Sequence, residues 1–173
     1  AWRGVARALK SRPSKSHQDL SRALADLDRA IELGEARLFA YPWRAELRHD
    51  LEDMSGAMED LDRILERDAR DVWARVERGE ILCESGRHGE ALEEFNRLVE
   101  ENPESSWAYA MRGRTLATTG REDQSLADLE RAVALDPRGA SAQAWLSEAK
   151  RKLGRYGEAL EHLDKALRLK PGF

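Results

Sequence analysis

Apolar residues along this chain recur every three or four positions, in pairs of segments that are separated by short breaks. Such spacing places the apolar side chains on one face of an α-helix. In one pair, a helix is predicted over Trp107 to Thr119, a turn follows at Gly120, and a second helix runs from about Asp123 until Asp136-Pro137 stops it. The pattern therefore predicts a unit of two helices joined by a tight turn, and no strand pattern is evident in the sequence.

This unit repeats every 34 residues, as two sets of residues show: Gly86, Gly120 and Gly154, and Pro103, Pro137 and Pro171. A constant period of this length is typical of a solenoid, in which one small unit stacks on copies of itself. We expect repeats at residues 38–71, 72–105, 106–139 and 140–173, preceded by a divergent first repeat at residues 1–37.

Further positions recur in phase when the repeats are counted from Val72, Ser106 and Ala140. Position 8 is small and position 24 is large and apolar, in the pairs Gly79 and Phe95, Gly113 and Leu129, and Ser147 and Leu163. Over roughly residues 38–173 this pattern resembles the tetratricopeptide repeat (TPR) family. The resemblance implies an all-α, right-handed α-solenoid of stacked antiparallel helix pairs, a TPR-like superhelix.

The early repeats depart from this pattern. Glu52 stands where the later repeats have their turn glycine, and Pro42 is expected in the first turn of its helix, where a missing N–H is harmless. In the first repeat we expect a helix over residues 1–10 and a second helix from about Leu20 that closes at Gly34. Residues 11–16 are polar and rich in helix breakers, so they predict an exposed loop that lengthens the turn.

Composition narrows the classes of function. Charged residues make up 36% of the chain but the formal net charge is only −4, so bulk charge predicts neither nucleic-acid nor membrane-surface binding. No apolar stretch approaches the length that spans a membrane. The single cysteine, Cys83, cannot form an internal disulfide, and we predict a cytoplasmic location.

The resemblance also implies where a ligand binds, because first helices of the repeats line the groove of this family. Three aromatic residues, which we call the aromatic ladder, occupy position 2 of successive repeats: Phe39, Trp73 and Trp107. Partly exposed aromatic side chains are good anchors for a bound peptide. The alternative is that they pack against the neighbouring repeat. The full predicted peptide-binding set is Phe39, Glu46, Asp50, Trp73, Glu80, Glu84, Trp107, Met111, Arg114 and Glu148.

The charged members of this set make one end of the predicted groove acidic, through Glu46, Asp50, Glu80 and Glu84. Such a surface would orient a peptide that carries a basic segment. The alternative is a solvated face whose charges pair with each other, in particular Arg114 with Glu80 and Glu148. The lysine, asparagine and arginine pattern with which some members of the family grip a C-terminal carboxylate is not present in either register tested.

Other chemistry has weak support in the sequence. His49 and Cys83 share position 12 of adjacent repeats, but two ligands do not make a zinc site, so no metal or cofactor is predicted. Basic residues recur in the turns and on the second helices, where repeat-encoded salt bridges are a better explanation than a phosphate-binding ridge: Arg87, Arg121 and Arg155, and Arg29, Arg63, Arg97, Arg131 and Lys165.

We therefore predict a non-catalytic scaffold that binds a protein or peptide on its concave face, with no nucleic-acid partner and no membrane span. One alternative is a structural module that self-assembles into a homo-oligomer through its terminal repeats. Another is the substrate-recruiting arm of a larger enzyme or signalling protein, which the start of the chain at Ala1, inside a predicted helix, favours.

Overall fold

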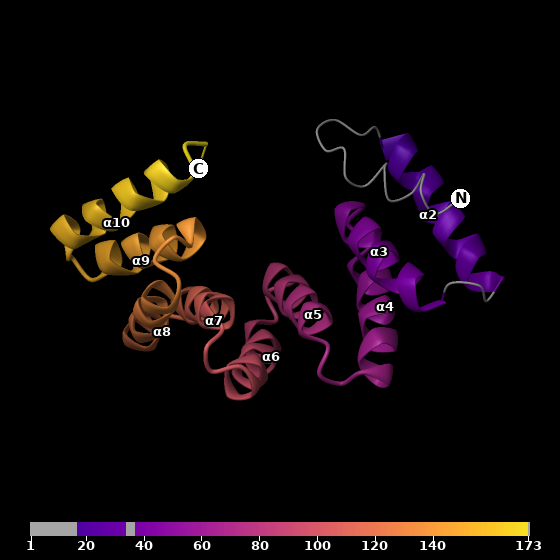
Figure 1. Cartoon of the computed structure of the whole chain (residues 1–173), viewed down its shortest axis with the longest axis horizontal. Helices are drawn as coiled ribbons and strands as arrows, with labels where there is room; N and C mark the ends of the chain where they lie inside the picture. The colour runs from indigo at the N-terminus through magenta and orange to yellow at the C-terminus, as the bar shows by residue number, and fades with distance from the viewer. Residues whose placement is uncertain (1–16, 34–36, 173) are drawn as a thin grey trace. The chain divides into compact units, whose positions relative to one another are not determined.

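The structure is a computed structural model that describes residues 17–33 and 37–172. In this part of the chain there are nine helices, α2 to α10, and no strand (Figure 1). The helices belong to two compact units, residues 1–77 and residues 78–173. The all-α helical-repeat fold predicted from the apolar periodicity is confirmed. The predicted helix at residues 1–10 and the predicted loop at 11–16 lie outside the described residues.

The first unit contains α2 (His17–Glu32), α3 (Arg37–Asp50), α4 (Met54–Arg67) and the start of α5 (Val72–Glu84). Helix α3 packs against both α2 and α4. Leu27, Ala40 and Leu47 are buried between α2 and α3, and Trp43 is partly buried against them. Pro42 lies in the second turn of α3, one turn later than expected, where it removes a backbone hydrogen bond of the helix.

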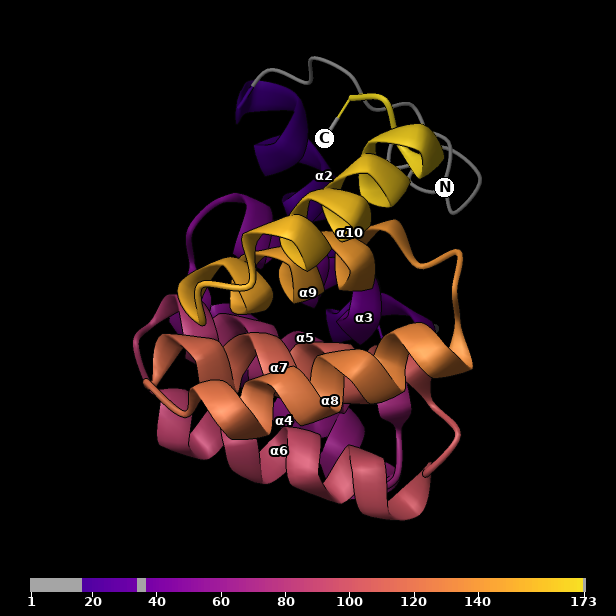
Figure 2. The ribbon, with the colours of Figure 1, turned by 90° about the vertical axis from the view of Figure 1, so that its left-hand side faces the viewer.

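The second unit contains the rest of α5, α6 (His88–Glu101), α7 (Ser106–Thr118), α8 (Glu122–Leu135), α9 (Ala140–Lys152) and α10 (Tyr156–Leu169). Helix α7 lies along α8, and α9 lies along α10 (Figure 2). Contacts of α6 with α7 and of α8 with α9 join successive pairs. Each pair thus buries its apolar face against the next pair, as stacked repeats require.

The division into repeats at residues 38, 72, 106 and 140 stays a prediction. Helices α5, α7 and α9 begin at the last three of these positions.

The turns between paired helices share one backbone conformation. Gly86, Gly120 and Gly154 have φ angles of 73°, 72° and 73°, in the left-handed region that favours glycine. Glu52 has a φ of 62°, and it is the one non-glycine residue with a positive φ in the part of the chain that the structure describes. The same six-residue hydrogen bond closes these turns, for example from Asp53 N to the Arg48 carbonyl at 2.8 Å. Glu52 therefore replaces the turn glycine in conformation as well as in position.

Small residues at position 8 allow the paired helices to approach closely. A Cβ atom added to Gly79 would lie 2.5 Å from Cζ of Phe95, and one added to Gly113 would lie 2.8 Å from Cγ of Leu129. Real Cβ atoms do not approach so closely, so the large residue at position 24 fills the space that the glycine leaves. The predicted pairing of positions 8 and 24 is confirmed for these two repeats.

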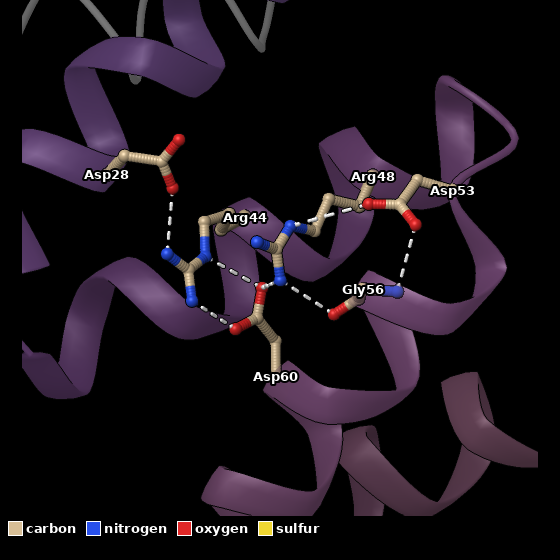
Figure 3. A network of polar contacts seen from close by, with 6 residues as sticks. All are labelled: Asp28, Arg44, Arg48, Asp53, Gly56 and Asp60. Carbon is tan, nitrogen blue, oxygen red and sulfur yellow. Dashed lines mark hydrogen bonds and ion pairs between the residues drawn. The ribbon is translucent and has the colours of Figure 1, made fainter.

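A network of arginine–carboxylate contacts joins α2, α3 and α4 in the first unit (Figure 3). Nε and Nη2 of Arg44 donate to the buried carboxylate of Asp60 at 2.9 and 2.6 Å, and Nη1 donates to Asp28 on α2 at 2.7 Å. Nη1 of Arg48 donates to Asp60 at 3.0 Å and to the Gly56 carbonyl at 2.8 Å. The hydrogen bond with Asp60, in particular, raises the pKa of Arg44 above its ordinary value, so the guanidinium stays charged.

The same contact recurs in the second unit. Nε and Nη2 of Arg112 donate to Asp128 at 2.6 and 2.8 Å, and Arg78 lies 3.8 Å from Glu94. Each arginine is at position 7 of its predicted repeat and each acid is at position 23. The sequence analysis missed this pairing, although the signal is present as a second 34-residue period in Arg44, Arg78 and Arg112 and in Asp60, Glu94 and Asp128.

Candidate functional site

The predicted peptide-binding residues lie on α3, α5, α7 and α9, the first helices of the predicted repeats. In the aromatic ladder, Phe39 is 74% exposed, Trp73 37% and Trp107 44%. Packing against a neighbouring repeat, the alternative for these residues, does not describe Phe39, because most of its ring surface faces solvent. The charged members are placed on these helices as follows: Glu46 and Asp50 on α3, Glu80 and Glu84 on α5, Arg114 on α7, and Glu148 on α9.

The first unit contains a shallow depression of about 350 Å³ between the start of α3 and the start of α5. The described residues that line it are three aromatic side chains, a proline and two carboxylates, with no lysine or arginine among them: Phe39, Pro42, Trp43, Glu46, Asp71 and Trp73. We call this the aromatic depression. Oδ1 of Asp71 accepts a hydrogen bond from the Ala74 N–H at 2.8 Å, which caps α5 and holds the turn that carries Trp73.

Two of the three rings in the aromatic depression, Phe39 and Trp73, are exposed, and Trp43 is partly buried against the core of α2 and α3. Phe39, Trp43 and Trp73 make no ring-to-ring or cation–π contact with any residue in the described ranges. Aromatic walls bind apolar side chains by burial and cations by the charge distribution of the ring. The depression can therefore accept an aliphatic or a cationic side chain, and its two carboxylates disfavour an anionic one.

The second unit holds a different aromatic cluster, in which the protein supplies its own cation. The rings of Trp107 on α7 and Trp145 on α9 are tilted by 45°, with centroids 6.2 Å apart. The guanidinium carbon of Arg114 lies 5.1 Å from the centroid of a Trp145 ring, within cation–π range. Trp145 is also partly buried against the core of α8 and α9. In this cluster Trp145 contributes mainly to packing, and the side chain that remains exposed is Trp107.

The charge pairing suggested for Arg114 is wrong in the structure. Glu148 is held by Arg151 on the same helix, whose Nε and Nη2 donate to its two carboxylate oxygens at 2.7 Å each. This hydrogen bonding lowers the pKa of Glu148 below its ordinary value. Arg114 lies over Trp145 instead. Sequence separation alone did not reveal this, because a one-turn i,i+3 pair competes with the contact between repeats.

Met111 differs from the rest of the predicted set because its side chain is fully buried in α7. Its expected role as a peptide contact is therefore corrected: a side chain with no exposed surface contributes to packing and cannot touch a partner in this conformation. The sequence could not separate the two roles, since position 6 of a repeat holds partly exposed tryptophans elsewhere, at Trp43 and Trp145.

Other candidate chemistry resolves into structural contacts. Sγ of Cys83 lies 3.2 Å from Oγ1 of Thr115 in the second unit. Within the described ranges, no group of three or more histidine, cysteine, aspartate or glutamate side chains could hold a metal ion. None of the described helices is both long enough and apolar enough to cross a bilayer.

The basic residues that recur in the turns form ion pairs with acids on the next turn of helix. Nη2 of Arg87 is 2.6 Å from Glu90, and Nη2 of Arg155 is 2.6 Å from Glu158. Gln124 stands at the acid's position after Arg121. The repeat-encoded salt bridge, preferred over a phosphate-binding ridge, is confirmed for Arg87 and Arg155.

Comparison with known proteins agrees with this architecture. Two tetratricopeptide repeat family models match residues 48–114 and 110–172. A solved structure of MamA, residue 41 to its end, from Desulfovibrio magneticus RS-1 has a TM-score of 0.78 at 18% identity, covering 99% of this chain and 93% of that one. TTC0263, a thermophilic TPR protein of Thermus thermophilus, has a TM-score of 0.72 at 24% identity, covering 89% and 84%.

A third solved structure, YrrB, is described as a TPR protein with an unusual peptide-binding site. It has a TM-score of 0.65 at 27% identity, and the match covers 89% of this chain and 79% of that one. No curated protein sequence is significantly similar to this chain.

Proposed function

Because this chain belongs to the tetratricopeptide repeat family, we propose that it is a non-catalytic scaffold that binds a peptide or protein segment through the exposed surface of the first helices of its repeats, α3, α5, α7 and α9. In the superhelix expected for the family, this surface is concave. The observation that carries the proposal is the exposure of the aromatic ladder, above all Phe39, which is 74% exposed beside the exposed ring of Trp73. Exposed tryptophan and other large aromatic side chains are typical anchors of protein interfaces.

The proposed contact set follows the structure and differs in part from the sequence prediction. Met111 leaves the set because it is buried, and Pro42 and Trp43 join it because they line the aromatic depression. The acidic residues of α3 and α5 stay in the set as groups that orient a partner of opposite charge. YrrB, with its described peptide-binding site, supports peptide binding as the kind of function to test.

A catalytic role has little support among the described carboxylates. Three glutamates have a pKa below the ordinary value, chiefly because neighbouring arginines donate hydrogen bonds to them: Glu90, Glu148 and Glu158. In Glu158 the pKa is lowered to about 2. A general acid near neutral pH requires the opposite shift, because it must hold a proton there. These residues fit structural ion pairs.

Selection from a displayed library of random peptides, carried out on the whole 173-residue chain, tests the proposal. We expect enriched peptides that lose binding to a Phe39→Ala, Trp73→Ala double variant. The matched control is Tyr156→Ala, which removes another exposed aromatic ring, on α10, and should leave binding unchanged. Enrichment of no peptide, or equal binding of the enriched peptides to the double variant, would overturn the proposal.

A second candidate function, self-assembly into a homo-oligomer, is favoured by the exposed face of α10. Tyr156 and Leu160 are 66% and 62% exposed, and Leu163 and Leu167 continue the same helical stripe. On α8 the corresponding stripe is covered by α9, through contacts of Leu126 and Val133 with the core around Leu146. An apolar stripe that interior repeats bury is a surface on which a second copy can dock.

Light scattering over a range of protein concentrations tests this candidate. The mass of the unmodified chain should rise with concentration, and Leu160→Glu should hold it at that of a monomer. Phe39→Glu, which places the same charge on the first unit, is the control and should behave as the unmodified chain. A monomer at every concentration would rule out self-assembly. The role of a recruiting arm in a larger protein stays a prediction.

A further inference from the structure

The second unit shows how this repeat seats a cation on its aromatic surface. Position 2 of one repeat supplies Trp107, position 9 of the same repeat supplies Arg114, and position 6 of the next supplies Trp145. The guanidinium carbon of Arg114 lies 5.1 Å from the centroid of a Trp145 ring. The Trp107 ring is tilted against Trp145, with the two ring centroids 6.2 Å apart. The side chain that fills this place is an arginine from the chain itself.

The first unit repeats part of this arrangement with the charge reversed. Phe39 and Glu46 occur 68 residues, or two repeat lengths, before Trp107 and Arg114. At the place where the second unit has its guanidinium, the first unit therefore has a carboxylate beside an exposed ring. Glu77 stands at the position of Trp145, so the further aromatic surface comes from Trp43 and Trp73, which line the same depression.

The charges and the aromatic rings of the depression both suit a cationic side chain. Its three rings make no cation–π contact with a described residue, although arginines elsewhere in the described ranges lie over aromatic rings. The described residues that line it include the carboxylates of Glu46 and Asp71, and none of them is a lysine or an arginine. A guanidinium has a flat face that stacks on aromatic rings and several N–H donors that match a carboxylate. An ammonium group lacks the flat face, so it suits this lining less well.

We propose that the aromatic depression of the first unit binds an arginine side chain of the partner segment, with the guanidinium over the exposed rings and facing the carboxylates of Glu46 and Asp71. The proposal rests on the proposed scaffold function and deepens it, since it gives the chemistry of the bound residue. The segment that fits is an arginine with an apolar residue on either side, because the other described residues that line the depression are aromatic side chains and a proline.

Nuclear magnetic resonance of the indole N–H groups, recorded on the whole chain, tests the proposal directly. The probes are two blocked pentapeptides, glycine-leucine-arginine-leucine-glycine and the same sequence with citrulline, which keeps the shape of arginine and removes its charge. We expect saturable shifts of the Trp43 and Trp73 indole signals with the arginine peptide, and binding about tenfold weaker with the citrulline peptide. The signals of Trp107 and Trp145 should not move.

A charge-reversal variant and its matched control complete the test. Glu46→Arg places a guanidinium where the second unit has Arg114, so it should occupy the depression from within and weaken the arginine peptide at least about tenfold. Glu59→Arg makes the same charge change at an exposed position of α4, outside the depression, and should retain affinity. Hydrogen exchange of the α3 and α4 amides that is as slow as in the unmodified chain shows that the first unit is folded in each variant.

The outcomes separate this inference from the scaffold function. Equal binding of the arginine and citrulline peptides at Trp43 and Trp73 would overturn the arginine site and leave the scaffold proposal standing. The same holds if library peptides that depend on Phe39 and Trp73 carry no arginine. Saturation by neither pentapeptide, shifts confined to Trp107 and Trp145, or equal loss in Glu46→Arg and Glu59→Arg would also overturn the arginine site.

Discussion

Replacing Glu52 by glycine is expected to stabilise the first unit. Glu52 has a φ of 62° in the turn between α3 and α4, where later repeats place a glycine at nearly the same angle. Its side chain is exposed and makes no hydrogen bond or ion pair with a described residue, so the substitution removes backbone strain and no contact. The reverse substitution, Gly120→Ala, introduces the same strain in the second unit.

The size of the effect follows from two opposing free energies. A non-glycine residue in the left-handed conformation costs about 1–2 kcal/mol. Glycine also makes the unfolded chain more flexible, which lowers the free energy of unfolding by about 0.4–1 kcal/mol. The net stabilisation by Glu52→Gly is therefore about 0.8 kcal/mol. A Cβ atom on Gly120 would meet nothing within 4 Å, so Gly120→Ala adds no clash and should destabilise by a similar amount.

Urea unfolding followed by helical circular dichroism measures both substitutions. With an m value of about 2 kcal/mol/M, the midpoint should rise by about 0.4 M for Glu52→Gly and fall by about 0.4 M for Gly120→Ala. Stacked repeats can unfold in parts, so hydrogen exchange of the α4 amides gives a local measurement beside the global one. A lower midpoint and faster α4 exchange in Glu52→Gly would refute the conclusion that Glu52 occupies a glycine conformation under strain.

Three further predictions concern the packing of the repeats. Asp60→Asn should cost about 3–5 kcal/mol in urea unfolding, because it leaves two arginines without their buried carboxylate, and Asp128→Asn, which meets one arginine, should cost less. Gly79→Ala should cost about 1–3 kcal/mol in the same assay, because its methyl group would overlap the Phe95 ring, and Phe95→Leu should recover part of the loss. Burial, helped by nearby lysines, lowers the pKa of His162 below its ordinary value of 6.5, so the folded chain binds fewer protons and its melting temperature should fall as the pH drops below 6.5.

Each of these has a result that would contradict it. Equal losses in Asp60→Asn and Asp128→Asn would mean that the second arginine adds nothing to the first network. Full stability of Gly79→Ala would mean that α5 and α6 can separate without cost. A melting temperature with the same slope below pH 6.5 in a His162→Gln variant would assign the acid sensitivity to other groups.

Much of the fold could be predicted from the sequence, because the 34-residue period repeats the local causes of structure. Gly86, Gly120 and Gly154 predict the left-handed turns, and the small residues at position 8 predict the close helix contacts. The unusual turn at Glu52 was found because its place in the period was known. The division into two compact units was not predicted, since it falls inside α5, between Glu77 and Arg78, where the helical pattern continues.

The candidate site could be predicted in outline only. Helix periodicity assigns a residue to a face, and so the first helices and the aromatic ladder followed from the repeat. Periodicity does not say how far a neighbouring helix covers that face. Only the structure shows Met111 fully buried and Phe39 largely exposed, because their exposure depends on which side chains from other helices pack over them.

The sequence by itself determined the helix pairs, their turns and the surface on which a partner is expected, since these depend on spacing within one repeat. The tertiary structure decided which charges and rings meet. Arg114 lies over Trp145, Glu148 pairs with Arg151, and no lysine or arginine is among the described residues that line the aromatic depression. Which pair forms depends on competition between contacts of neighbouring repeats. The distances that decide this competition cannot be read from the 34-residue period of the sequence.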